Sequence, residues 1–464
     1  MPIRTAAALI AVTLLLTGCA SAPDRRQPAT RLPDQWQSDQ SPRGLDVQTW
    51  WTRFQDPTLA RLLQAARQDS PTLAQAVAAI DKARASRASA ESGLWPSLNA
   101  SADATAAGSL KKDSGTRTEG KTASGGLDAS WELDLFGRTR GSVVSASALI
   151  QAREADWHDG QVSLAAEVAT DYVDYRACRI RQGYYEAEAD SQSKTKELTR
   201  IAARAGFTAP AEVRLAEASE ASTRATALAQ RTECEVLLQT LVALTGMAEP
   251  ELRQALDAGP ATLPTPEGLR VTAVPADLLR QRPDVYAAER ALASARALIG
   301  VAEAERWPSL TLSGTIALTG TQGGASTAPW SFGPALTLPV FDAGRISADI
   351  RSARADYDSA LATYQQAVRD AVKEVEQALV RLDSMAARES EASRSAAGYR
   401  AYLQATEQNW RTGGVSLLDL EIARRASITA DLTLLELQQN RLENWIALYK
   451  AVGGGWQADA VTAQ

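Results

Sequence analysis

Residues 127–135 read Leu-Asp-Ala-Ser-Trp-Glu-Leu-Asp-Leu, a strict alternation of apolar and polar side chains. Because successive side chains of a β-strand point to opposite faces, this stretch predicts a strand with one apolar and one polar face. The alternation extends over about 122–135 and recurs at about 97–108, 309–320 and 329–341. Such strands suit a membrane barrel with a wet lumen, where each strand needs ~9–11 residues. A half-buried soluble sheet alternates equally, so the pattern by itself leaves both alternatives open.

The start of the chain favours the membrane. Arg4 precedes an apolar stretch that is too short to span a bilayer, as in a secretory signal of residues 1–18. The following Leu16-Thr17-Gly18-Cys19 resembles the bacterial lipoprotein box, in which the cysteine is lipidated and becomes the mature N-terminus. We therefore expect Cys19 to carry fatty acids such as palmitate, with residues 19–44 as a polar tether. The alternative is an ordinary signal cut near Ala20.

Four strands are too few to close a barrel, and an open sheet edge is not tolerated in lipid. The chain also has no second apolar layer that would cover the sheet in water. Closure therefore requires several copies of the chain, giving eight strands for a dimer or twelve for a trimer.

The chain contains an internal repeat. Trp95-Pro96-Ser97-Leu98 recurs as Trp307-Pro308-Ser309-Leu310, and Gly137-Arg138 recurs as Gly344-Arg345. This order predicts a tandem duplication of about 200 residues. The expected repeats are residues 45–246 and 276–455, with a linker at 247–275 and a tail at 456–464.

Each repeat ends in two long helices. No proline interrupts residues 138 to about 205 or 343 to about 412. Val368, Val372, Val375, Leu379 and Leu382 follow the 4-3 spacing of a coiled-coil seam. Gly206 to Pro210 and Thr412 to Val415 break these runs, so each repeat should close with a long helical hairpin.

Composition excludes several functions. The net charge of −6 argues against nucleic-acid binding, which needs a basic face. One histidine and three cysteines are too few for a His/Cys metal site or a His-based catalytic triad, so we expect neither enzyme activity nor a cofactor or metal. Residues 115–122 match the phosphate-binding pattern G-x-x-x-x-G-K-T, but an alternating strand follows, so they are interpreted as an extracellular hairpin loop.

Several motifs together resemble the TolC outer-membrane efflux family, and most closely its lipoprotein branch, which serves resistance-nodulation-division pumps. The motifs are the tandem repeat, the lipoprotein box, Trp131 to Arg138 (WELDLFGR), Leu278 to Val285 (LLRQRPDV) and Pro339 to Arg345 (PVFDAGR). The resemblance covers roughly residues 45 to 455. It implies an α+β membrane protein, completed as a homotrimer with a twelve-stranded β-barrel and a twelve-helix periplasmic tunnel. An equatorial band that includes residues 45–70, 247–275 and the C-terminal tail would surround the helices.

The resemblance also implies a gate and partner-binding ends. In the family, inward acidic residues close the tunnel just after the second hairpin turn, and here Asp419 matches the first of them. Ile422 occupies the second position, and Glu421 lies about 100° around the helix from it, too far to complete the same ring. The hairpin tips, with Gly206, Phe207, Gly413 and Gly414, would contact the periplasmic adaptor.

Two cysteines remain inside the first repeat. Cys178 and Cys234 lie at nearly equal distances along the chain on either side of the first hairpin turn, so a disulfide between them is sterically plausible in an oxidising periplasm. Two buried free thiols are the alternative.

The expected protein is a passive outer-membrane channel, lipid-anchored and extending into the periplasm. It would conduct small molecules such as drugs and toxic compounds, with energy supplied by an inner-membrane pump through a periplasmic adaptor (membrane fusion protein). Outer-membrane lipid is the other expected partner. The alternatives are a type I protein-secretion conduit and, in another class, a periplasmic helical adaptor or scaffold.

Overall fold

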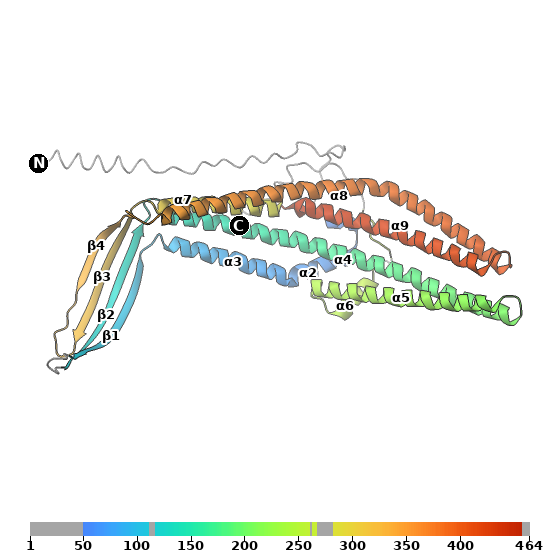
Figure 1. Ribbon diagram of the computed structural model, residues 1–464, viewed down its shortest axis with the longest axis horizontal. Helices are drawn as coiled ribbons and strands as arrows, with labels where there is room; N and C mark the ends of the chain where they lie inside the picture. Colours follow the sequence, from blue (N-terminus) through green and yellow to red (C-terminus); the bar gives the residue numbers. More distant parts are fainter. Residues whose placement is uncertain (1–49, 111–116, 260–261, 267–281, 457–464) are drawn as a thin grey trace. The chain divides into compact units, whose positions relative to one another are not determined.

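The computed structural model describes residues 50–110, 117–259, 262–266 and 282–456. These residues form two compact units (Figure 1). Unit 1 contains residues 78–154 and 287–366, and unit 2 contains the other described residues. The two long helices of the repeats, α4 (Arg138–Arg204) and α8 (Arg345–Arg411), have residues in both units.

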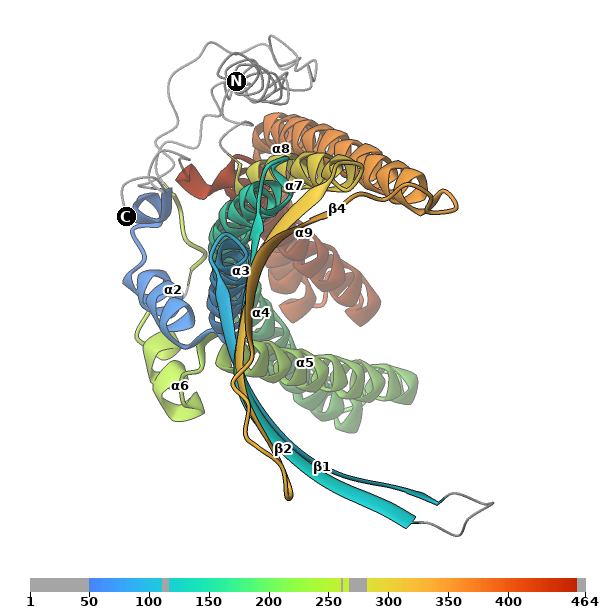
Figure 2. The same ribbon diagram turned by 90° about the vertical axis from the view of Figure 1, so that its left-hand side faces the viewer.

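Unit 1 is built on a four-stranded antiparallel sheet with the strand order β1-β2-β3-β4. Figure 2 shows the sheet curving along its length. The register places Leu98 opposite Ala129, Leu127 opposite Ile316, and Ile316 opposite Trp330. The strands are β1 (Ser97–Leu110), β2 (Arg117–Leu133), β3 (Ser309–Thr321) and β4 (Trp330–Thr337).

The register gives the sheet one apolar and one polar face, as the alternation predicts. Residues opposite each other in paired strands share a face, so the apolar residues of one strand meet those of the next. The apolar face includes Leu98, Leu127, Trp131, Leu312, Ile316, Phe332 and Trp330. The polar face includes Asn99, Ser101, Asp103, Ser124, Asp128, Thr315 and Ser331. On that face the hydroxyl groups of Ser101 and Ser124 donate to Asp128 and Asp103.

The largest differences from the expected strand boundaries are at the start of β2 and the end of β4. β2 begins at Arg117, because its pairing with β1 continues to Leu110 opposite Arg117. The interpretation of residues 115–122 as a loop is therefore wrong for 117–122, which belong to β2. Because β2 and not a helix follows the G-x-x-x-x-G-K-T pattern, no helix N-terminus is present there to bind a phosphate. β4 ends at Thr337 instead of 341, and Pro339 follows without an N–H to donate to a neighbour.

The long helix begins with the same structural motif in both repeats. A glycine with positive φ, Gly137 (81°) or Gly344 (89°), turns the chain from the sheet into the helix. The preceding aspartate accepts a hydrogen bond from a first-turn amide: Asp134 from Arg140 at 2.8 Å, and Asp342 from Ile346 at 2.8 Å. The repeated Gly-Arg pairs are thus explained by helix initiation.

The other helical residues of unit 1 come from α3 (Pro71–Ser92) and α7 (Pro283–Ala304). Each of these helices is followed in the chain by a β-hairpin of the sheet. Trp131 Nε1 donates to the carbonyl of Leu94 at 3.0 Å, and the rings of Phe136 and Trp307 stack with centroids 5.4 Å apart. These aromatic contacts fix the chain where strands meet helices.

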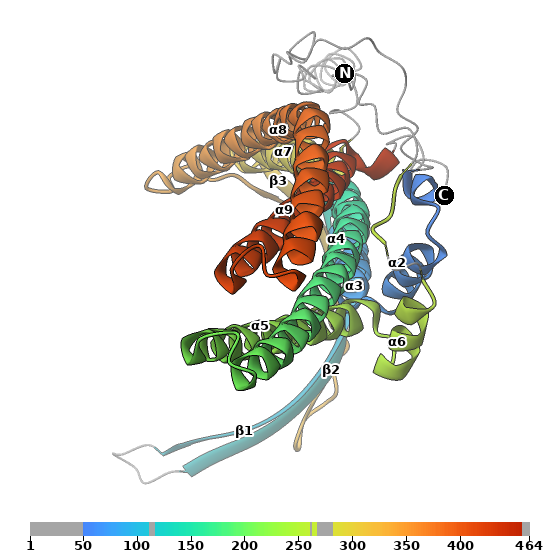
Figure 3. The ribbon, with the colours of Figure 1, turned by 90° about the vertical axis from the view of Figure 1, so that its right-hand side faces the viewer.

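Unit 2 contains two helical hairpins, α4–α5 and α8–α9, whose turns are visible in Figure 3. Near the ends, Ala216 of α5 packs with Leu417 and Leu420 of α9. Helix α5 spans Pro210–Thr245, and α9 spans Leu417–Ala451. The expected long helices and hairpin breaks are therefore confirmed.

Short elements pack on the hairpins of unit 2. They are η1 (Trp50–Phe54), α2 (Pro57–Asp69), α6 (Glu249–Asp257) and η3 (Gly453–Gly455). Asp56 caps α2 by accepting from the amides of Thr58 and Leu59, and it also accepts from the hydroxyl of Tyr172 in α4 at 2.6 Å. Trp50 packs against Trp445 and Tyr449 of α9. Part of the expected linker, 247–275, is thus helical.

Candidate functional site at the hairpin ends

The first hairpin turn exposes a large aromatic side chain. Gly206 takes a positive φ of 81° and its amide donates to Ala203, while the amide of Phe207 donates to Ala202. This pair of bonds is a Schellman motif, which satisfies the last carbonyls of α4. Pro210 then starts α5. Phe207 is 87% exposed, so its ring packs little against the hairpin.

The second turn has the same backbone and a different surface. Gly413 has a φ of 78°, its amide donates to Trp410, and the amide of Gly414 donates to Asn409. Gly414 thus stands where the first turn has Phe207. The tip of the first hairpin therefore exposes an aromatic ring, whereas the equivalent position in the second hairpin is a glycine without a side chain.

Asp419 has a structural role at the start of α9. Its Oδ2 accepts from the Ser416 amide at 3.0 Å and the Ser416 hydroxyl at 2.6 Å, and its own amide donates back to Ser416. This is a capping box, with Ser416 as N-cap. The hydrogen bonds from Ser416 hold the pKa of Asp419 below its usual value, so the exposed carboxylate is ionised at neutral pH.

Glu421 is turned into the interface between α9 and α4. It is buried, its Oε1 lies 2.9 Å from Arg424 Nη1, and its other oxygen accepts from Gln192 of α4. Gln192 also donates to Glu188, whose pKa is raised chiefly by burial. The structure therefore does not bring Glu421 together with Asp419 and Ile422.

Leu418 and Arg425, which the sequence analysis did not single out, lie beside Ile422. Leu418 is 52% exposed and Ile422 is 50% exposed, one turn apart on α9, and the exposed Arg425 follows them. The 4-3 spacing of these three residues places them on one face. This spacing is the sequence feature that could have identified the exposed face. Apolar residues at such spacing normally indicate a buried face, however, so the sequence by itself favours the opposite interpretation.

Cys178 of α4 and Cys234 of α5 are joined by a disulfide, with their Cα atoms 5.6 Å apart. Both cysteines are buried in the contact between the two helices of the first hairpin. Gln230 Nε2 lies 2.9 Å from the Cys178 sulfur. The link fixes the middle of that hairpin and leaves its tip free.

Cys19, the expected lipidation site, lies outside the described residues. Within the part of the chain that the structure describes, no group of three or more His, Cys, Asp or Glu side chains is arranged to hold a metal ion. No described helix is both long and apolar enough to cross a bilayer.

A curved sheet with an apolar and a polar face, carried by a chain with two long helical hairpins, defines the class of protein. The sheet of one chain ends in two open edges, at β1 and β4, so it is one part of a larger barrel. The class is a channel-forming protein of a membrane.

The chain belongs to the outer membrane efflux protein family, whose model matches residues 62–247 and 274–454. It is 30% identical to nodulation protein T of Rhizobium leguminosarum bv. viciae, over 99% of this chain and 95% of that protein. It is also 30% identical to the cation efflux system protein CusC of Escherichia coli O6:H1, over 96% of this chain and 98% of that protein.

Solved structures agree with this assignment. The outer-membrane channel OprN is 31% identical, with a TM-score of 0.81, and the match covers 95% of this chain and 100% of that one. The open state of the Neisseria gonorrhoeae MtrE outer membrane channel is 28% identical, with a TM-score of 0.80 and coverage of 95% and 99%.

The expected fold class is thus confirmed: three copies of the chain, with four strands each, complete a β-barrel of twelve strands, and their hairpins form the α-barrel. The protein is an outer-membrane efflux channel, the exit duct of a tripartite pump. The alternative of a periplasmic adaptor or scaffold is wrong, because the chain belongs to the outer membrane efflux protein family. The family is one of channel proteins.

Proposed function

We propose that this efflux channel is a lipid-anchored, passive duct for small molecules, joined to an inner-membrane pump of the resistance-nodulation-division type by a periplasmic adaptor. The main support for this proposal is the face of α9 that contains Leu418, Asp419 and Ile422, which the fold leaves exposed at the hairpin end. Its relatives are named for the export of chemically different cargo, cations in one case and pyoverdine in another. A duct without a cargo-specific pocket would be compatible with both.

The gate consists of an apolar ring flanked by an acidic one. Three copies of Leu418 and Ile422 would meet around the three-fold axis, and apolar constrictions close by dewetting. Three Asp419 carboxylates beside them would attract cations. Glu421 takes no part, because it is paired with Arg424 inside the interface.

Conductance and reversal potential of the purified channel in planar bilayers test this gate. Asp419→Asn removes the charge and keeps an oxygen that accepts from Ser416, so it should reduce cation preference without loosening α9. Ser416→Ala is the matched control, because it removes the cap partner and leaves the charge. Ile422→Ser should raise conductance with little change in selectivity, and Glu421→Gln should change the ion current less than either. If Asp419→Asn and Ile422→Ser both conduct like the unaltered protein, the gate lies elsewhere.

The hairpin tips are the proposed adaptor contacts. Phe207 supplies a protruding ring at one tip, and Gly413 and Gly414 leave backbone accessible at the other. Phe207→Ala should weaken cross-linking of the channel to its adaptor in cells. Leu228→Ala, an exposed position far from the tip on α5, is the control. Equal cross-linking of both variants would refute a role for Phe207.

A type I protein-secretion conduit is the alternative within the class. Deletion of the gene separates the two functions. Increased sensitivity to toxic small molecules with an unchanged set of secreted proteins supports efflux, and the reverse supports secretion.

A further inference from the structure

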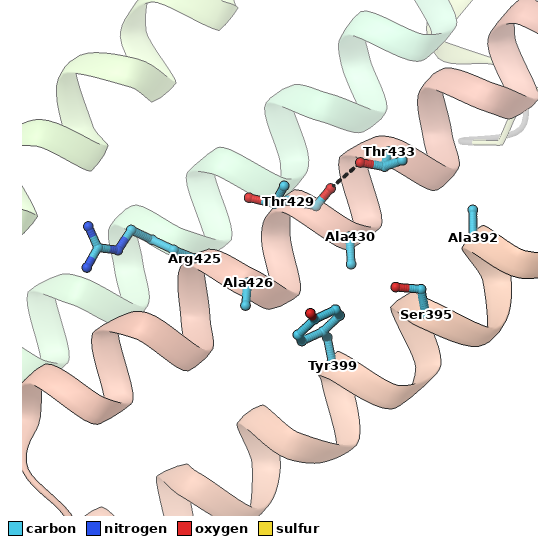
Figure 4. Close-up of a pocket in the computed structure, with 8 residues that line it drawn as sticks. All are labelled: Ala392, Ser395, Tyr399, Arg425, Ala426, Thr429, Ala430 and Thr433. Carbon is cyan, nitrogen blue, oxygen red and sulfur yellow. Dashed lines mark hydrogen bonds between the residues drawn. The ribbon is translucent and has the colours of Figure 1, made fainter.

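The open edges of the sheet define a partner more sharply than the recess between α8 and α9. That recess, of about 350 Å³, is lined mainly by alanine, serine and threonine, and Figure 4 shows the guanidinium of Arg425 pointing away from Tyr399. Its lining therefore selects no particular occupant. Along β1 and β4, by contrast, backbone N–H and C=O groups recur at the fixed spacing of an antiparallel ladder.

Every second residue of β4 directs its backbone groups to the open edge. Thr319 of β3 and Thr327 exchange two N–H···O bonds of 2.9 Å. The pairing continues in the same register to Thr337, which lies opposite Ser309. Odd-numbered residues of β4 therefore face β3, and even-numbered residues face away from it.

The free edge of β1 has the same phase. The Gln322 amide donates to the Lys121 carbonyl at 2.9 Å, so odd-numbered residues of β2 face β3 and even-numbered residues face β1. Because Ser97 lies opposite Ser130, odd-numbered residues of β1 face β2. The even-numbered residues of β1 therefore face its open edge, as those of β4 do.

The two β-hairpins of the sheet have the same internal register. In the first, Ser97 lies opposite Ser130. In the second, Ser309, which matches Ser97 in the repeat, lies opposite Thr337. Residue by residue, β3 therefore corresponds to β1, and β4 corresponds to β2.

This correspondence predicts how the two open edges fit together. Within the chain, β2 pairs with β3 so that Leu133 lies opposite Leu310. The equivalent pairing of β4 with the β1 of a second copy puts Val340 opposite Leu98. Both of these residues are even-numbered, as the free backbone groups require.

The fit gives a neighbour to an exposed apolar segment. Among the described residues, β4 ends opposite the first residue of β3, so Leu338 and Val340 have no strand beside them. Val340 is 90% exposed, and Leu98 of β1 is 68% exposed. In the fitted pairing each lies beside the other. Pro339 does not interfere, because an odd-numbered residue would direct its absent N–H toward β3.

The side chains of the two edges are also complementary in size. On the apolar face, β4 carries the exposed rings of Trp330 and Phe332, whereas β1 carries alanine at 100, 102, 104 and 106 and glycine at 108. The fitted pairing places Phe332 opposite Ala106 and Trp330 opposite Gly108. Each large side chain thus lies opposite a small one, which leaves room for the two strands to pair.

We propose that β4 of one copy pairs with β1 of the next copy in this register, and that β4 then extends to Val340, as the sequence alternation predicts. We call this pairing the seam. A second copy is the occupant, because its β1 has the matching hydrogen-bond phase and small side chains. Pro334 contributes a carbonyl to the seam but no N–H. The proposal goes beyond the proposed function, since it concerns how the barrel closes and does not depend on the gate.

Disulfide cross-linking in isolated outer membranes tests the seam. Thr337 lies opposite Ser101 in it, and both are odd-numbered, so they form a non-hydrogen-bonded pair with Cα atoms about 4.5 Å apart, within the range of a disulfide. Thr337→Cys/Ser101→Cys should therefore give covalent trimers on a non-reducing gel and monomers after reduction. The chain's own disulfide joins Cys178 to Cys234 within one hairpin and does not link copies.

Slipped pairs are the matched controls. Thr337→Cys combined with Asn99→Cys or with Asp103→Cys moves the second cysteine two residues along the same face of β1, to a diagonal distance of about 7–8 Å. Both combinations should lose the covalent trimer, as should each single variant.

A size exchange across the seam gives a second measurement. Ala102→Phe should crowd Leu336 of the next copy and lower the fraction of trimer in mild detergent. Leu336→Ala in the same chain should restore the trimer, because the two positions lie opposite each other in the seam.

The outcomes separate the seam from the proposed function. Stronger cross-linking of a slipped pair than of Thr337→Cys/Ser101→Cys overturns the register. A channel that conducts but cross-links through none of these pairs overturns the seam and leaves the proposed function intact. A cross-linked trimer that conducts no ions overturns the proposed function and supports the seam.

Discussion

Removing the disulfide between Cys178 and Cys234 should loosen the first hairpin and leave the second unchanged. The change is the double variant Cys178→Ala/Cys234→Ala. Alanine is the appropriate replacement because both sulfurs are buried, and serine would bury two hydroxyl groups in an apolar contact. The trimer should still assemble, because long stretches of α4 and α5 pack on either side of the link.

The expected size follows from the chain that the link closes. The two cysteines are 56 residues apart in sequence, and the chain-entropy model assigns about 4 kcal/mol to a loop of that length. If the hairpin opens as one unit, this corresponds to a roughly thousandfold increase in its opening equilibrium. It is an upper value, because the neighbouring helices also restrict the open state.

Hydrogen exchange followed by mass spectrometry measures this opening. Amides between residues 178 and 234 should exchange faster in the double variant, and those of α8 and α9 serve as the internal reference, since the described part of the second hairpin has no disulfide. Equal exchange of the first hairpin in both proteins would refute the reasoning. Uniform acceleration in both hairpins would instead show that the link stabilises the whole assembly.

Three further predictions concern single positions. Burial, with Asp174 and Glu167 nearby, raises the pKa of Asp171 from 3.8 to about 6. The folded protein therefore holds a proton that the unfolded chain releases, and its stability should fall as pH rises from ~4 to ~6. Asp171→Asn should raise the thermal midpoint at pH 7.5 and have little effect at pH 4, and the exposed Asp190→Asn, as the control, should leave the midpoint at pH 7.5 unchanged. The same midpoint at pH 7.5 for Asp171→Asn and the unaltered protein would contradict this. Gly413→Ala forces a side chain into the left-handed region and should cost ~1–2 kcal/mol, while Gly398→Ala, in open space within α8, should stabilise by up to ~1 kcal/mol, both measured by thermal unfolding. Mass spectrometry of the mature N-terminus should find acylated Cys19, and an unmodified terminus at another residue would exclude the lipid anchor.

The sequence by itself determined the elements whose periodicity is local. Alternation from Leu127 to Leu135 required a two-faced strand, and the proline-free runs before Gly206 and Gly413 required long helices, because a strand repeats every two residues and a helix every 3.6. The repeated Gly-Arg pairs marked the same helix start twice. Four such strands also required more than one chain, since hydrogen bonds at a sheet edge must be satisfied in lipid.

Only the tertiary structure decided which helix face is exposed. The sequence places Glu421 about 100° around the helix from Ile422 without showing which of the two is buried. In the structure Glu421 is buried against Gln192 of α4, while Ile422 remains exposed. The pairing of β1 with β2 likewise carried the strand to Arg117, into residues that look like a loop. Burial and strand length depend on which segment, distant in sequence, arrives as the neighbour, and local periodicity contains no record of that partner.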